Sequence, residues 1–117
     1  MRQAGILAAA GIYALANNVD RLADDHANAR AIADRLAACP AFRLDPSTVQ
    51  TNILVFDLAP DRGVPDAAAF IAACRERGVL LNAFGPRVVR AVTHLDVDAA
   101  ACANAAEIMV EVAGSGR

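Results

Sequence analysis

Lysine and tryptophan are absent from this chain of 117 residues, and all of its 11 basic residues are arginine. They stand against 13 acidic residues, so the formal net charge is −2. Proteins that bind the phosphate backbone of nucleic acids need a broad basic surface, which this balance of charge does not supply. We therefore expect no nucleic-acid partner.

Long hydrophobic runs are missing as well. The longest uncharged apolar stretch covers residues 4–16, whereas a membrane-spanning helix needs about 20 residues. The cysteines, Cys39, Cys74 and Cys102, are far apart and form neither a CxxC pair nor a zinc-ligand pattern. We expect a cytoplasmic protein with reduced thiols, no membrane attachment and no metal site.

Aromatic residues are scarce at 4% of the chain, although hydrophobic types reach 56%. This composition is typical of a globular protein rather than a disordered one. The length corresponds to about one domain. We treat residues 1–117 as a single domain that ends in a flexible tail at residues 114–117.

Four segments are predicted helices, at residues 4–15, 19–38, 65–77 and 97–112. The first is predicted from its content of Ala, Leu and Ile, and the second from an apolar stripe at spacings of three and four. Asp96 is the expected N-cap of the last one, and Gly78 the expected C-cap of the third. The buried stripe expected on the second helix consists of Val19, Leu22, His26, Ala29, Ala33 and Leu36.

The strands and the fold class follow from the remaining segments. Runs rich in β-branched and apolar residues predict strands at 51–58, 79–82 and 87–93, with a short extended piece at 42–44. The predicted fold class is α+β: two N-terminal helices followed by a β-α-β-β-α layer. A small, mainly antiparallel sheet carries helices on one face.

The first helix, residues 4–15, has no polar face and must therefore be covered on all sides. The rest of the chain has material to cover one side of it. A side left open would expose a few hundred Å², which monomers rarely tolerate as one patch. We predict that the chain forms a homo-oligomer through this helix and buries Leu7, Ile12 and Leu15.

The histidines and cysteines give weak site signals. His26 has no second His or Cys one turn away, which favours a packed structural role. His94 and Asp96 can meet at a strand end, but the sequence supplies no third metal ligand. The cysteines lie in Ala-rich helical surroundings, which is typical of buried small hydrophobic residues.

Arginine offers the better candidates for an anion site. Arg87 and Arg90 lie in one predicted strand, three residues apart, so they point to opposite faces unless a bulge intervenes. An arginine fork holds a carboxylate or a phosphate bidentately. On spacing alone, a surface arginine and an anion site both remain open. Arg2 precedes a helix N-terminus, which is a second and weaker signal for an anion.

Three stretches together resemble the low-specificity L-threonine aldolases. They are residues 1–15 (MRQAGILAAAGIYAL) continuing into residues 17–29 (NNVDRLADDHANA), Thr51-Asn52 at the start of a strand, and residues 90–96 (RAVTHLD). The resemblance covers the whole chain, but only the C-terminal part of that family. The family is similar in fold to the aspartate-aminotransferase group of pyridoxal-phosphate enzymes. The resemblance implies the small C-terminal domain of such an enzyme. Residues 84–87 are the segment least similar to the family.

The site roles come from this resemblance. Arg90 matches the arginine that binds the substrate carboxylate. Arg2 matches the arginine near the cofactor phosphate, in its own or a neighbouring subunit's site. The resemblance gives this chain no catalytic residue, because the Schiff-base lysine is missing and pyridoxal phosphate cannot attach covalently. The family positions with structural roles are matched by His26, Asn52, Thr93 and His94.

Three functions compete. The first is a C-terminal domain or fragment of a pyridoxal-phosphate-dependent L-threonine aldolase, which cleaves threonine or allo-threonine to glycine and acetaldehyde and is inactive alone. The second is a non-catalytic binding or oligomerisation module that keeps this fold. The third is an unrelated α+β domain that senses a small ligand, which the length of the match in the first helix disfavours.

Overall fold

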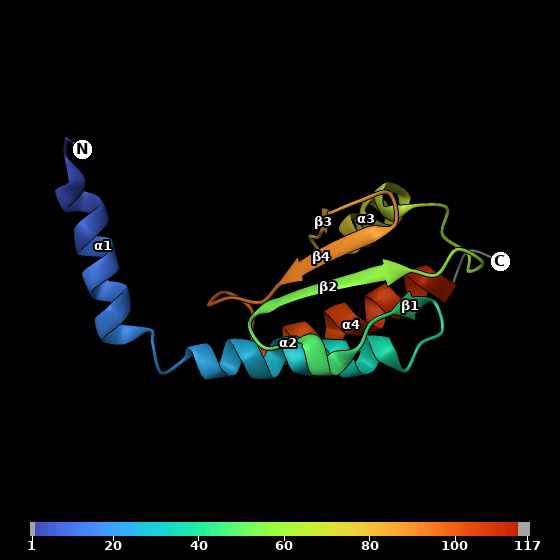
Figure 1. The fold of residues 1–117 in the computed structure, drawn as a ribbon, viewed down its shortest axis with the longest axis horizontal. Coiled ribbons are helices and arrows are strands. Elements are labelled where there is room, and N and C mark those ends of the chain that lie inside the picture. Colours follow the sequence, from blue (N-terminus) through green and yellow to red (C-terminus); the bar gives the residue numbers. More distant parts are fainter. Residues whose placement is uncertain (1, 115–117) are drawn as a thin grey trace.

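The computed structural model describes residues 2–114, and over this range it has the predicted α+β architecture (Figure 1). The elements in chain order are α1 (Ala4–Asn17), α2 (Leu22–Ala37), β1 (Phe42–Arg43), the 3₁₀ turn η1 (Pro46–Thr48), β2 (Ile53–Leu58), α3 (Ala67–Glu76), β3 (Asn82–Ala83), β4 (Val88–Val92) and α4 (Ala99–Gly114).

The strands form one antiparallel sheet in the order β1-β2-β4-β3. The third strand begins later than predicted, at Asn82 rather than residue 79. The reason is local: the N–H of Val79 donates to the carbonyl oxygen of Cys74 at 3.0 Å, so Val79 still closes the end of α3. Residues 80 and 81 then lead from the helix to the sheet.

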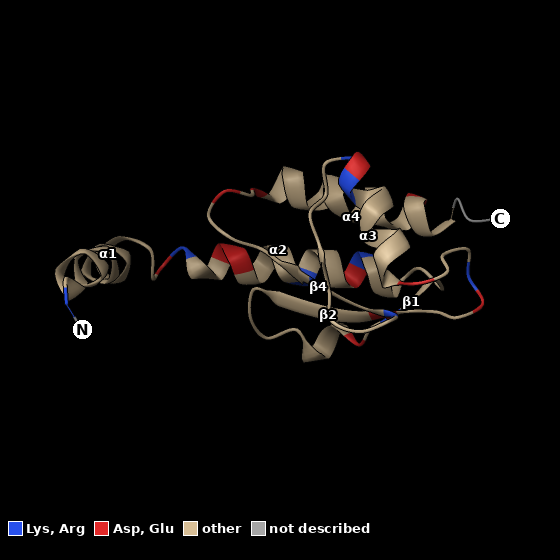
Figure 2. Ribbon diagram, turned by 90° about the horizontal axis from the view of Figure 1, so that it is seen from above, with Lys and Arg blue, Asp and Glu red and all other residues tan. Residues whose placement is uncertain are grey.

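Helices α2, α3 and α4 cover one face of the sheet (Figures 1 and 2). Alternate residues of β2, namely Leu54, Phe56 and Leu58, are buried under them, and the intervening residues are exposed on the other face. Phe56 packs edge to face with Phe42 and Phe70, with ring centroids 5.5 to 6.4 Å apart. This leaves the opposite face of the sheet open.

Helix α1 stands away from this body, and none of its residues is buried (Figure 1). It carries no charged residue (Figure 2), and its large apolar side chains are 65% to 80% exposed. The expectation that the rest of the chain covers one side of this helix is therefore wrong. Residues 18–21 turn the chain so that α1 leaves the end of α2, and α2, α3 and α4 already occupy the covered face of the sheet. The side chains concerned are Ile6, Leu7, Ile12, Tyr13 and Leu15.

The buried stripe of α2 begins later than predicted. Val19 and Leu22 are about half exposed, and His26 is exposed, so the expected packing of this histidine is wrong. The first turn of α2 extends past the end of the sheet (Figure 1). The buried residues of α2 are Asp25, Ala29, Ile32, Ala33 and Leu36.

Aspartate side chains cap the starts of α3 and α4. Asp66 and Asp98 each accept the main-chain N–H three residues ahead, both at 2.8 Å. The predicted cap Asp96 is wrong by two residues, because Asp98 is the residue that directly precedes α4. Gly78 follows α3 with a left-handed φ of 84°, as expected of a residue that ends a helix.

Helix α4 ends at Gly114, and the rest of the expected tail, residues 115–117, lies outside the described residues. Between residues 2 and 114, no helix is both long enough and apolar enough to cross a membrane.

Candidate functional site

Arg90 lies in the centre of the open face of the sheet. It is the middle residue of β4, whose neighbours Val89 and Ala91 are buried under the helices. Since successive residues of a strand point to opposite faces, the Arg90 side chain projects from the uncovered face. On that face its cross-strand neighbours are Val55 of β2 and Asn82 of β3.

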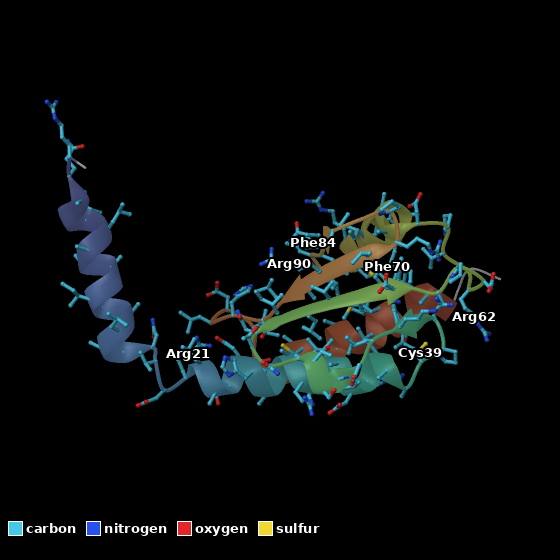
Figure 3. All side chains as sticks on the ribbon, viewed as in Figure 1. Arg21, Cys39, Arg62, Phe70, Phe84 and Arg90 are labelled. Carbon is cyan, nitrogen blue, oxygen red and sulfur yellow. The ribbon has the colours of Figure 1, made fainter. Side chains whose placement is uncertain are left out.

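The guanidinium of Arg90 is not engaged by an anion of its own chain. Among residues 2–114 it makes no hydrogen bond or ion pair. It lies over the ring of Phe84, whose centroid is 6.0 Å from the guanidinium carbon (Figure 3). The side chain is half-buried. A half-buried arginine whose N–H groups are unpaired can donate them to both oxygens of a carboxylate.

Arg87 is used differently. It lies just before β4, and its guanidinium donates to main-chain carbonyl oxygens of the loop between β2 and α3. These are the oxygens of Leu58 at 2.9 Å, Ala59 at 2.7 Å, Val64 at 3.2 Å and also Pro65. Its donors are therefore occupied in fixing that loop, and they are not available to a ligand.

Arg2 lies far from Arg90. It is exposed and precedes α1, which projects away from the sheet (Figure 1). The residue between Arg2 and the helix, Gln3, has a left-handed φ of 58° and makes no side-chain cap. Within this chain the two arginines therefore do not form one site.

Buried hydrogen bonds hold the end of β4 against α2 and β2. The hydroxyl of Thr93 donates to the main-chain oxygen of Asp25 at 2.6 Å, and the amide of Asn52 donates to the main-chain oxygen of Thr93 at 2.8 Å. Asp25, only 3% exposed, receives two N–H donors from Arg21. Asn52 and Thr93 thus fix the strand that carries Arg90.

The two histidines do not form a metal or catalytic centre. The ring of His94 lies 3.6 Å from the carboxylate of Asp96, and its Nδ1 accepts the Asp96 N–H at 3.3 Å. Both residues are exposed, as is His26. No group of three metal-ligating side chains occurs in the described part of the chain.

The cysteines are poor nucleophiles. Burial raises the pKa of Cys74 to about 11, and burial together with nearby Asp98 raises the pKa of Cys102. A cysteine attacks as its thiolate, which these shifts disfavour at neutral pH. Cys39 lies just after α2 and is half-buried (Figure 3).

An apolar groove of about 380 Å³ lies between α4 and the chain around the end of β4. It opens on the side of the sheet that faces the helices, and Arg90 does not line it. The groove is therefore separate from the arginine on the open face. Its lining includes Val79, Leu81, Ala91, Thr93, Cys102 and Ile108.

Phe84 is the site residue that sequence reasoning misses. Residues 84–86 predict a turn, and a turn residue gives no hint of a contact with Arg90. The usable signal is the hairpin register: an aromatic residue two positions beyond the cross-strand partner of Arg90 lies on the same face. That register becomes known only when the ends of β3 are fixed.

Comparison with known proteins agrees with the resemblance in the sequence. Residues 1–59 match the family described as beta-eliminating lyase. The chain is 48% identical over 97 residues to the low specificity L-threonine aldolase of Escherichia coli (strain K12), which covers 83% of this chain and 26% of the relative. It is 43% identical over 61 residues to the probable low-specificity L-threonine aldolase 2 of Arabidopsis thaliana, covering 52% of this chain and 17% of the relative. The chain thus spans about a quarter of the length of the E. coli relative. It belongs to the beta-eliminating lyase family and matches a fragment of the low-specificity L-threonine aldolases.

Proposed function

We propose that this chain is the C-terminal portion of a pyridoxal-phosphate-dependent L-threonine aldolase. The parent reaction is the cleavage of threonine or allo-threonine to glycine and acetaldehyde. The observation that carries the proposal is Arg90, whose unpaired guanidinium lies half-buried on the open face of the sheet. Its role is to bind the carboxylate of the β-hydroxy-α-amino acid.

Arg90 serves the reaction by orientation. A bidentate contact fixes the plane of the carboxylate and, with it, the direction of the Cα–Cβ bond that breaks. A wrong orientation of a reacting bond costs about 100-fold in rate. Asn52 and Thr93 contribute by holding the end of β4 in register with its neighbours.

The residues of this chain do not build a cofactor site by themselves. There is no lysine for a Schiff base, and Arg2 is the one cation at the start of α1 that suits a phosphate. In this enzyme class pyridoxal phosphate supplies the electron sink. The cofactor contacts other than Arg2 come from outside this chain.

The isolated chain is expected to be inactive. Incubation of residues 1–117 with pyridoxal phosphate should give no lysine-bound imine, and added threonine should release acetaldehyde no faster than it does with the cofactor alone, because the chain has no lysine. Release of glycine faster than with the cofactor alone would contradict the proposal.

A chimaera tests the role of Arg90. Residues 1–117 replace the segment that they match in the E. coli low-specificity L-threonine aldolase, and the hybrid should cleave threonine. Arg90→Lys should raise KM by about 10-fold or more, because charged hydrogen bonds of the fork contribute about 1.5–3 kcal/mol. Arg87→Lys is the matched control and should leave KM nearly unchanged. An inactive hybrid, or equal effects of the two substitutions, would overturn the assignment.

The second candidate is a non-catalytic binding or oligomerisation module, and the exposure of α1 favours it. An uncharged helix with no buried residue is the kind of surface that another chain covers. We propose that the protein assembles as a homo-oligomer through α1, with or without aldolase activity. Free cysteines at all three positions support a reducing compartment such as the cytoplasm.

A further inference from the structure

Phe84 differs from the other phenylalanines of the chain. Phe42, Phe56 and Phe70 are buried and pack edge to face in the core. Phe84 lies outside that cluster and is 67% exposed. Core packing therefore does not explain an aromatic residue at this position.

The hairpin between β3 and β4 places Phe84 on the same face as Arg90. Asn82 is directly opposite Arg90, and Phe84 lies two residues further along the same strand direction. The N–H of Phe84 donates to the carbonyl oxygen of Val88 at 2.8 Å, which extends the pairing to this residue. Phe84 and Arg90 are thus diagonal neighbours, a spacing that an aromatic ring and a long side chain can bridge.

The two side chains meet in the way a cation meets an aromatic face. The guanidinium carbon of Arg90 is 6.0 Å from the centroid of the Phe84 ring (Figure 3). The face of an aromatic ring attracts a cation through its π-electrons, so Phe84 can restrict the guanidinium without pairing its N–H donors with an oxygen acceptor. The donors stay available for a carboxylate.

We propose that Phe84 is a positioning residue for Arg90: its ring holds the guanidinium on the open face of the sheet, with the donor edge directed at the substrate carboxylate. This inference rests on the proposed role of Arg90 in the aldolase. It makes the orientation of Arg90 depend on the hairpin residue Phe84.

The pairing itself is tested on the 117-residue chain by NMR with ¹⁵N-labelled arginine. Ring currents of Phe84 should displace the Arg90 Nε–H resonance, which Arg90→Lys identifies by its disappearance. Phe84→Leu keeps apolar bulk without a ring and should return that resonance toward the other arginines, whereas Phe84→Tyr should not. A resonance that is the same in all three proteins would overturn the inference.

The effect on the substrate is tested in the chimaera with the E. coli aldolase. Phe84→Leu should raise KM for threonine roughly 2- to 10-fold, with kcat changed by less than about twofold, and Phe84→Tyr should restore most of the loss. In the Arg90→Lys background, Phe84→Leu should add nothing, because its effect passes through the guanidinium.

The outcomes separate this inference from the proposed function. If Arg90→Lys raises KM and Phe84→Leu does not, only the inference on Phe84 fails. If Phe84→Leu raises KM equally with and without the arginine, its role is structural and the inference fails again. If Arg90→Lys leaves KM unchanged, the proposed function and this inference fail together, whatever the NMR result.

Discussion

At the scale of single residues, position relative to β4 separates two arginines of identical chemistry. Arg90 falls on the open face of β4, where its donors are unpaired. Arg87 lies just before β4, and its guanidinium donates to the loop carbonyls. The sequence predicts that the two face opposite ways. It does not predict which of them is occupied, because that depends on the path of the loop between β2 and α3.

Arg87→Lys should destabilise the chain. A lysine offers one point of charge where the guanidinium spreads its donors over several carbonyls, and hydrogen bonds of charged groups contribute about 1.5–3 kcal/mol. We expect the free energy of unfolding in urea to fall by about 1–3 kcal/mol. Arg62→Lys, in the same loop but exposed, is the control and should change it by less than about 0.5 kcal/mol. Equal effects would show that the carbonyl contacts contribute nothing.

The buried thiol of Cys74 should make stability fall at alkaline pH. Its pKa is raised by burial from 9.0 to about 11, so the unfolded chain loses this proton at a lower pH than the folded chain. The stabilisation is complete below pH 9 and is lost as the pH rises toward 11. Urea unfolding under reducing conditions should show a loss of about 2 kcal/mol over this range. Cys74→Ala should reduce the dependence of stability on pH in this range. An unchanged slope would show that the Cys74 thiol does not cause the loss.

At the scale of elements, the N-caps and the ends of helices are predicted from the sequence less accurately than the helices themselves. Helix α4 needs an aspartate before its first turn, and the sequence offers both Asp96 and Asp98. Only Asp98 accepts a main-chain N–H of the helix, while Asp96 lies beside His94. The choice follows from where β4 ends and the chain turns.

Asp98→Ala should therefore lower stability, and Asp96→Ala should not. Removal of an N-cap aspartate costs about 1 kcal/mol, whereas loss of an exposed carboxylate near a histidine costs less than about 0.5 kcal/mol. Thermal or urea unfolding of the two variants, followed by circular dichroism, measures the difference. A larger loss in Asp96→Ala would show that the helix begins earlier than Ala99.

The element types and their order are predictable from the sequence, because apolar periodicity and β-branched runs are local signals. The stripe of α2 shows the limit of this reasoning. Its periodicity continues through Val19, Leu22 and His26, but burial depends on how far the sheet extends beside the helix. Asp25 shows the reverse case, since a charged residue is buried there with Arg21 as its partner. Periodicity predicts neither the exposure of the first residues nor the burial of Asp25, because burial depends on tertiary neighbours such as Thr93.

At the scale of the whole molecule, two surfaces remain uncovered: α1 and the open face of the sheet. The first has no charged residue, and the second carries Arg90 and Phe84 beside Val55 and Asn82. Both are understandable if the chain functions with further protein around it. The sequence predicts Arg90 as a candidate site residue, but it does not predict that Arg90 lies on an uncovered face of the sheet. Which face is covered depends on how α2, α3 and α4 pack against the sheet (Figure 1).

Self-association through α1 should be measurable. Sedimentation of the chain at micromolar concentration should give a mass above that of the monomer, since burial of Leu7, Ile12 and Leu15 removes a large apolar area from water. Ala8→Glu places a charge among the small residues of α1 and should shift the equilibrium to monomer. A monomeric unsubstituted chain would contradict this prediction.

The central claim is that Arg90 binds the carboxylate of the substrate, and a pair of ligands tests it most directly. In the chimaera with the E. coli aldolase, KM for threonine is compared with the inhibition constant of 1-aminopropan-2-ol, which is the same skeleton without the carboxylate. Arg90→Ala should raise the threonine constant by about 10- to 100-fold and leave that of the amino alcohol within about threefold. An equal loss for both ligands, or no loss for threonine, would contradict the account.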